Sequence, residues 1–305
     1  MITFESFLSG TPARDYILDE TPYEEQLEKA SRLLGGAKYV LIGAGAGLSA
    51  AAGVASGSGF FQKNFQEFIE KYPGPYMKDM YSAGFYPFLT EEAKWGYWSK
   101  HALLGCNDGK GSVLYEQVLE LVKDKQYFVL TTNVDEQFRA AGFPEERVFA
   151  TQGSYERIQC KKGCHTKTYD AVKMFRQMDQ ARKACEVPSY MVPACPVCGG
   201  QMEMNLRSDH HFVQDEAWYE AQERFGDFLQ KALNSGGKIC LLELGTGFNT
   251  PMIIRFPFEK LVREHENVSL VRLNLNEAVI QKSLKNREVG INADLAEVIP
   301  DLVGI

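Results

Sequence analysis

Four short runs of apolar residues stand out along the chain, and we interpret each of them as a buried β-strand. Most of these runs are continuous rather than alternating, which is typical of strands that are covered on both faces. They occupy residues 39–42, 127–131, 239–244 and 268–273. Stretches with the helical spacing of apolar residues precede them, at 27–34, 113–122 and 225–233. This repeated order of helix and strand predicts βαβ units and a parallel sheet.

Two segments interrupt that order. Residues 59–104 are rich in aromatic side chains, and we interpret them as a helical insertion over the carboxyl edge of the sheet. Residues 158–207 carry well-spaced cysteines and little strand pattern, which favours a small inserted module. The predicted fold class is therefore α/β, with both segments inserted into a Rossmann-like domain that is formed by residues 1–58, 105–157 and 208–305.

Composition narrows the class of protein. The chain has 305 residues and a net charge of −7, which disfavours a general nucleic-acid binder and a protein that binds anionic membranes. The first 19 residues do not resemble a signal peptide, and no apolar run is long enough to span a membrane. Seven cysteines, an odd number, favour a reduced compartment over a disulfide framework. We expect a cytoplasmic protein.

A glycine-rich turn follows the first predicted strand, from Gly43 to Gly53. Glycine lets the backbone approach an oxyanion closely, and the helix that follows offers free N–H groups to a phosphate. A tight turn between strand and helix without a ligand is the alternative. The next strand does not end in an acidic residue as it does in dehydrogenases, which disfavours hydride transfer.

Two cysteine pairs have the spacing of a zinc site. They are Cys160 with Cys164, and Cys195 with Cys198. Four thiolates on tight turns form a tetrahedral Zn²⁺ site with no open position for water, so the metal would be structural. The alternative is a set of reduced cysteines without metal, and Cys185 and His165 are spare candidate ligands.

Several motifs in one order resemble those of the sirtuin family. The run from Gly45 to Ser49, with Gly53 beyond it, resembles the sirtuin Gly-Ala-Gly-x-Ser motif. The run from Thr131 to Asp135 resembles the sirtuin Thr-Gln-Asn-Ile-Asp motif. The resemblance covers residues 25–301 and implies that the chain binds NAD. The implied NAD-binding residues are Gly45, Ala46, Gly47, Ser49, Gly53, Thr132, Gly245, Thr246, Gly247, Asn249, Asn274, Asn276, Ala293 and Asp294.

The resemblance also implies the reaction centre. Asn133 would contact the nicotinamide ribose, Asp135 would hold the nicotinamide amide, and Gln152 would lie beside the bond that breaks. Taken alone, Asn133 and Asp135 are more typical of a loop-capping turn than of a reaction centre.

Gln152 is the most important departure from the sirtuin pattern. Deacylating sirtuins carry a histidine here that acts as a general base on a ribose hydroxyl, and a glutamine amide cannot accept that proton. Ala55 and Ser56 replace a Pro-Asp pair, and Thr132 replaces a glutamine. These changes weaken any implied recognition of acyl-lysine.

Gln152, together with the run from Gly245 to Pro251, resembles the macrodomain-linked class M sirtuins. The resemblance implies an NAD-dependent protein ADP-ribosyltransferase, with a lipoylated carrier protein as a candidate substrate and a macrodomain hydrolase as a functional partner. Two alternatives stay open: an NAD-dependent protein deacylase that tolerates Gln152, and a non-catalytic sensor of NAD or ADP-ribose.

Overall fold

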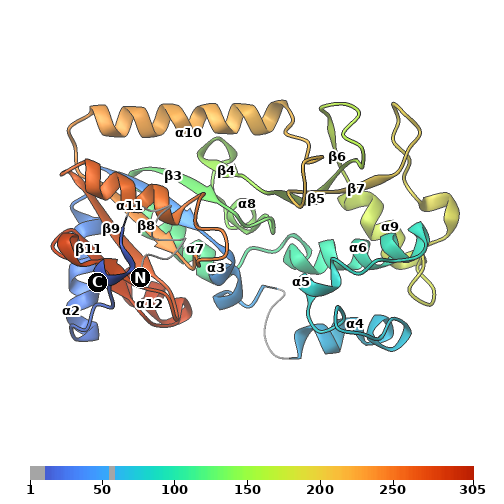
Figure 1. Cartoon of the computed structure of the whole chain (residues 1–305), viewed down its shortest axis with the longest axis horizontal. Helices are drawn as coiled ribbons and strands as arrows, with labels where there is room; N and C mark the ends of the chain where they lie inside the picture. Colours follow the sequence, from blue (N-terminus) through green and yellow to red (C-terminus); the bar gives the residue numbers. More distant parts are fainter. Residues whose placement is uncertain (1–10, 55–58) are drawn as a thin grey trace.

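A six-stranded parallel sheet forms the centre of the protein (Figure 1). The computed structural model describes residues 11–54 and 59–305. The spatial order of the strands is β11-β9-β8-β2-β3-β4. Their bounds are β2 (Tyr39–Ala44), β3 (Gln126–Thr131), β4 (Val148–Ala150), β8 (Ile239–Leu244), β9 (Val268–Leu273) and β11 (Glu288–Ile291). The predicted parallel sheet is confirmed, and the strands β4 and β11 are too short to have appeared as apolar runs.

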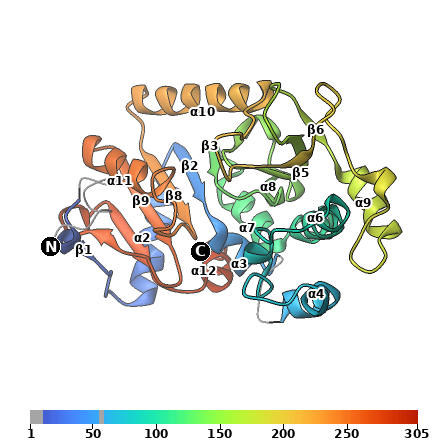
Figure 2. The same ribbon diagram turned by 45° about the vertical axis from the view of Figure 1, so that its right-hand side comes forward.

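Helices cover both faces of this sheet. The helices α2 (Tyr23–Gly35), α7 (Val113–Val122) and α12 (Leu295–Val303) lie on one face, and α10 (Glu216–Asn234) and α11 (Arg255–Glu264) lie on the other (Figure 2). Side chains alternate along a strand, so Val40 and Ile42 of β2 pack into the first layer while Tyr39 and Leu41 pack into the second. Burial on both faces is the physical reason for the continuous apolar runs in the sequence.

The aromatic segment is helical. It contains α4 (Phe60–Lys71), α5 (Met80–Ala83) and α6 (Glu91–Gly105). Its aromatic side chains form a core of their own, in which Phe65 and Phe68 pack against Tyr97 of α6. Residues 55–58, which join it to the first βα unit, lie outside the described residues. They include Ala55 and Ser56, two of the departures from the sirtuin pattern.

The cysteine-bearing segment builds a three-stranded antiparallel sheet in the order β6-β5-β7, formed by β5 (Gly153–Cys160), β6 (Thr168–Asp170) and β7 (Met202–Leu206). The helix α9 (Val172–Ala181) packs Phe175 against Trp95 of α6, so this sheet and the helical segment share a core. Both lie beside the parallel sheet in Figure 1. The domain boundaries stay a prediction.

The remaining short elements are α3 (Ala46–Ala51), α8 (Gln137–Ala140) and a small antiparallel pair, β1 (Tyr16–Ile17) with β10 (Ile280–Gln281). The other elements among the described residues are five single 3-10 turns, at Ala13–Asp15, Asn107–Gly109, Glu145–Arg147, Ser189–Met191 and Lys282–Leu284. Within the described ranges, none of the helices combines the length and the apolar character that crossing a membrane requires.

Candidate active site

Two glycine turns meet at the carboxyl edge of the parallel sheet. β2 leads into Gly45 and α3, and the neighbouring β8 leads into Gly245. The N–H of Gly47 donates to the carbonyl of Gly245 at 3.0 Å. A Cβ at Gly245 would lie 2.4 Å from the nitrogen of Leu48, and the residue has φ +61°. Glycine meets both conditions, since the left-handed conformation disfavours a side chain and the close backbone approach leaves no room for one.

The glycine turn after β2 is where the phosphates of NAD are predicted to bind. Gly45 is the N-cap of α3 and supplies no side-chain capping bond to the first turn of the helix, and Ala46 is exposed. Backbone N–H groups at a helix start, next to small residues, are suited to the oxygens of a pyrophosphate. Gly45, Ala46 and Gly47 stay predicted contacts of the NAD phosphates, and the N–H groups of Gly45 and Gly47 already donate to the carbonyls of Leu244 and Gly245.

Asn133 is buried at the end of β3, with 8% of its surface exposed. Its side-chain nitrogen donates to the carbonyl of Gly45 at 3.0 Å and to the hydroxyl of Tyr115 at 3.1 Å. A carbonyl oxygen can only accept, so the contact with Gly45 fixes which end of the amide is nitrogen. Both amide protons are used, and the side-chain oxygen of Asn133 has no hydrogen-bond partner among the described residues.

Asp135 lies close to Asn133 and is buried to a similar degree, with 7% exposed. One carboxylate oxygen accepts from the N–H of Gln137 at 3.1 Å, and the other accepts from the hydroxyl of Ser49. Burial raises the pKa of Asp135, and the hydrogen bond from Ser49 opposes that rise. Because each carboxylate oxygen accepts a hydrogen bond, the geometry suits the ionised form.

Tyr115 of α7 completes this cluster, and it was missed in the sequence. Its hydroxyl lies 2.9 Å from the Oγ of Ser49, and the side chain is fully buried. Burial and the nearby Asp135 raise the pKa of this phenol well above its usual value. In the sequence Tyr115 belongs to an apolar helical stripe and is indistinguishable from a core aromatic, so only the fold reveals its contact with Asn133.

Gln152 lies in the turn that follows β4, the strand next to β3. Ala150 of β4 pairs with Thr131 of β3, and Asn133 and Gln152 each follow this pair by two residues. The backbone of Gln152 accepts from the N–H of Arg207 at 3.0 Å, and its side chain is half-buried. The structure thus places Gln152 at the same sheet edge as Asn133.

The loops after β8 and β9 are joined to each other. The side-chain amide of Asn274 donates to the carbonyl of Thr246 at 2.8 Å, and its oxygen accepts from the N–H groups of Asn276 and Glu277 at 3.1 and 3.0 Å. Asn274 therefore fixes the shape of both loops. Gly247 and Asn249, also predicted to bind NAD, lie on the loop after β8, where Asn249 is exposed.

Four fully buried charged side chains support these loops, and none of them was predicted from the sequence. Arg272 of β9 donates to both oxygens of Glu243 at 2.8 Å and to Glu259 at 3.1 Å. Arg255 donates to the carbonyl of Thr246 at 3.2 Å. Burial, and then the charge of Arg272, lower the pKa of Arg255 to about 10. The hydroxyl of Thr246 donates to Glu243, so the loop rests directly on this charged cluster.

The other residues predicted to bind NAD lie on neighbouring turns. The N–H of Thr132 donates to the carbonyl of Ala44 at 3.1 Å, and Gly53 has φ +70°. Asp294, which follows Ala293, caps α12 by accepting from the N–H of Ala296 at 2.9 Å. These residues stay predicted contacts of NAD.

The four predicted cysteines converge on one point. Sγ of Cys160 lies 3.7 Å from Sγ of Cys198, and Sγ of Cys164 lies 3.6 Å from Sγ of Cys195. All four sulfur atoms lie within 4.8 Å of one another. A tetrahedron with zinc–sulfur bonds of about 2.3 Å has edges of about 3.8 Å, so these residues fit structural zinc. Cys185, a spare candidate, packs instead in the core of the helical segment.

His165, the other spare candidate, lies near this cluster without joining it. Its Nε2 is 3.7 Å from Sγ of Cys195 and 3.0 Å from the hydroxyl of Tyr169. The four thiolates complete a tetrahedral set by themselves. We therefore place His165 next to the zinc ligands rather than among them.

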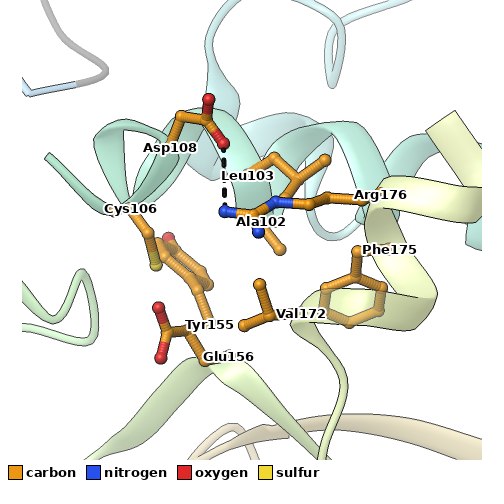
Figure 3. Close-up of a pocket in the computed structure, with 10 residues that line it drawn as sticks. Ala102, Leu103, Cys106, Asp108, Tyr155, Glu156, Val172, Phe175 and Arg176 are labelled. Carbon is orange, nitrogen blue, oxygen red and sulfur yellow. Dashed lines mark ion pairs between the residues drawn. The ribbon is translucent and has the colours of Figure 1, made fainter. Parts of the chain in front are cut away.

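A small pocket lies between α6, α9 and β5 (Figure 3). Cys106, Tyr155 and Glu156 line it, and Arg176 pairs with Asp108 across it at 3.5 Å. None of the residues predicted to bind NAD lines this pocket. The pocket is therefore not the predicted dinucleotide site.

Comparison with known proteins identifies the family. The chain is 32% identical over 288 residues to a protein ADP-ribosyltransferase of Staphylococcus aureus, and the match covers 94% of this chain and 89% of that relative. A Sir2 protein solved with a propionylated peptide has the same fold, with a TM-score of 0.55 at 17% identity over 91% of this chain and 97% of that one. The chain belongs to the sirtuin family. No family model matches this sirtuin.

Two further similarities extend the comparison. A Sir2 homologue solved with NAD has a TM-score of 0.55 at 16% identity, over 96% of this sirtuin and 97% of that chain. A probable bifunctional ADP-ribose hydrolase/ADP-ribosyltransferase of Fusarium oxysporum is 30% identical over 302 residues. The match covers 94% of this sirtuin but 49% of that relative, so this sirtuin spans about half of the fungal protein.

Proposed function

We propose that this sirtuin is an NAD-dependent protein ADP-ribosyltransferase, which releases nicotinamide from NAD and transfers ADP-ribose to a protein. The observation that carries the proposal is Gln152, a residue without a basic group, at the same sheet edge as Asn133. The similarity to the staphylococcal ADP-ribosyltransferase over nearly the whole chain supports it.

The chemistry follows from the residues at this edge. The bond between the ribose C1′ and the nicotinamide nitrogen breaks, nicotinamide leaves with the bonding electrons, and the ribose gains positive character. The side-chain oxygen of Asn133 and the carboxylate of Asp135 provide negative potential in a site where water is largely excluded. Such preorganised groups stabilise the developing charge without any reorganisation at the moment of reaction.

Transfer to a protein then needs an acceptor at C1′. The acceptor nucleophile forms a bond to C1′ and loses its proton to solvent or to a nearby group. Deacylation would instead require a base to activate a ribose hydroxyl, and the amide of Gln152 cannot take up a proton. Gln152 is suited to orienting a hydroxyl or an amide through hydrogen bonds, which favours transfer over deacylation.

The partners also form part of this proposal. The substrate is a protein, with a lipoylated carrier protein as the candidate. A macrodomain hydrolase would reverse the modification, and the name of the bifunctional fungal relative supports such a pairing for that protein. We also propose a cytoplasmic location on the basis of the seven cysteines, which fractionation of cells with an antibody to this chain would test.

Labelled NAD separates the candidate functions. The purified chain is incubated with it and, in parallel, with a lipoylated carrier protein or an acylated peptide. Label attached to the carrier supports the proposal. Formation of 2′-O-acyl-ADP-ribose from the peptide, with no labelled protein, assigns deacylation instead. Binding of NAD without release of nicotinamide in any mixture assigns a sensor.

A further inference from the structure

The phenol of Tyr115 lies between Asn133, which is predicted to contact the nicotinamide ribose, and Asp135, which is predicted to hold the nicotinamide amide. It accepts from Asn133 at 3.1 Å and lies 2.9 Å from Ser49, whose hydroxyl in turn donates to Asp135. We propose that Tyr115 is a positioning residue that links Asn133 to Asp135 through one directional chain of hydrogen bonds. The inference rests on the proposed function of this site.

The direction of the chain is set by which atoms can donate. The ionised carboxylate of Asp135 can only accept, so the hydroxyl of Ser49 must donate to it. The proton of Ser49 is then used, and the phenol of Tyr115 must donate to Ser49. The proton of Tyr115 is used in its turn, and the phenol oxygen can only accept from Asn133. Every proton in the chain has one position.

This order fixes the amide of Asn133. One of its protons goes to the carbonyl of Gly45 at 3.0 Å and the other goes to Tyr115. Turning the amide over would place its oxygen against the carbonyl oxygen of Gly45, which cannot donate, and against the phenol oxygen of Tyr115, whose proton is already used. The side-chain oxygen of Asn133 is therefore held toward the ligand side, where its partial negative charge faces the ribose.

Tyr115 is rigid enough for this role. Its ring packs edge-on against Phe138, with ring centroids 4.9 Å apart. The preceding residue Leu114, and Val118 on the next turn of the same helix, lie in the main core. A fully buried ring on a packed helix has few alternative rotamers. The position of the phenol oxygen is thus set by the core and not by the ligand, as preorganisation requires.

The test is Tyr115→Phe, which removes the hydroxyl and keeps the ring. The rate of nicotinamide release at saturating NAD should fall about tenfold, as expected for losing one hydrogen bond that orients a group in the transition state. The dissociation constant for NAD should change less than about threefold, because Asn133 keeps its bond to Gly45.

The control is Tyr97→Phe. Tyr97 is also fully buried, and its hydroxyl donates to the carbonyl of Met80 at 3.0 Å and lies 2.9 Å from Nδ1 of His101, within the helical segment. Its loss should lower thermal stability about as much as the loss of the Tyr115 hydroxyl while leaving nicotinamide release unchanged. This comparison separates positioning from a general loss of stability.

A double variant tests the chain itself. In a Ser49→Ala background the chain of hydrogen bonds is already broken. Adding Tyr115→Phe should therefore lower the rate of nicotinamide release less than twofold further, because the effects of substitutions in residues that act as a unit are not additive. An unchanged rate in the single variant, or effects that multiply in the double variant, overturns the inference alone. A wild-type protein that releases no nicotinamide with any acceptor overturns the proposed function, and the inference with it.

Discussion

Replacing Glu243 by glutamine removes one negative charge from the buried cluster that supports the loop after β8. The cluster holds two carboxylates and two guanidinium groups, and all four side chains are fully buried. Glutamine has nearly the same shape, so the change tests charge rather than packing. Its amide group would face the donors of Arg272, where the wild-type carboxylate accepts two hydrogen bonds.

The expected cost follows from the burial of the charges that remain. Arg272 and Arg255 would keep Glu259 as the one carboxylate that pairs with both of them, while Glu288 and Glu277 act on them only through their charge, so the pairing of the two arginines would be incomplete. Breaking a buried ion pair in this way costs about 3–5 kcal/mol of unfolding free energy. At roughly 2–4 °C for each kcal/mol, the melting temperature should fall by about 6–20 °C.

The assay is thermal and urea unfolding of both proteins, with Glu264→Gln as the matched control. Glu264 pairs with Lys260 at 3.8 Å on the surface, with more than half of each side chain exposed. Its loss should cost at most about 0.5 kcal/mol. Affinity for NAD, measured by calorimetry, should also fall in Glu243→Gln, because the hydroxyl of Thr246 loses the carboxylate to which it donates.

The pH dependence gives a second measure of the same charge. Burial alone would raise the pKa of Glu243, but Arg272 and Arg255 outweigh it and hold the pKa below the usual value of 4.5. Stability from such a group is present above the unfolded pKa and is lost as the pH falls through the lower folded pKa. Below pH 4.5, the stability of Glu243→Gln should therefore depend less on pH than that of the wild type. Equal melting temperatures and equal acid profiles for the two proteins would refute this reasoning.

Three further predictions concern the zinc cluster, the glycine turn and Gln152. Metal analysis should find about one zinc per chain, and Cys198→Ser should lose it and lower the melting temperature; a zinc-free wild type of equal stability contradicts the assignment. Gly245→Ala should weaken NAD binding at least about tenfold, since its Cβ would lie 2.4 Å from the nitrogen of Leu48; unchanged calorimetric affinity contradicts the account. Gln152→His should introduce some deacylation of an acylated peptide if the missing base alone prevents it, and product analysis showing none would mean that substrate recognition also differs.

The parallel sheet and the cysteine cluster could be predicted because each depends on residues close together in sequence. Strands buried on both faces must be apolar throughout, and such runs are visible without any knowledge of their partners. A pair of cysteines on one tight turn supplies half of a zinc site by itself. The glycine at 245 is similar only in its left-handed backbone, because its close approach to Leu48 is a contact between segments far apart in sequence.

Tyr115 and Glu243 could not be recognised in this way. Each lies in a helix or strand whose pattern is explained by the core, and each gains its role from a residue far away in sequence. Tyr115 lies 18 positions from Asn133, and Glu243 lies 29 positions from Arg272. A buried charge or phenol is stable only beside its partner, and the partner is brought there by the packing of the whole domain.

The sequence by itself determined four of the six strands of the parallel sheet, the glycine-rich turn after the first of them, and that no base stands at position 152. These properties are local, because side-chain size, apolarity and proton affinity belong to a residue wherever it lies. The tertiary structure alone decided which end of the Asn133 amide points to Gly45, and which buried charges support the loop at Thr246. These properties are relations between distant residues, and hydrogen-bond direction and charge compensation exist only once the fold has brought the partners together.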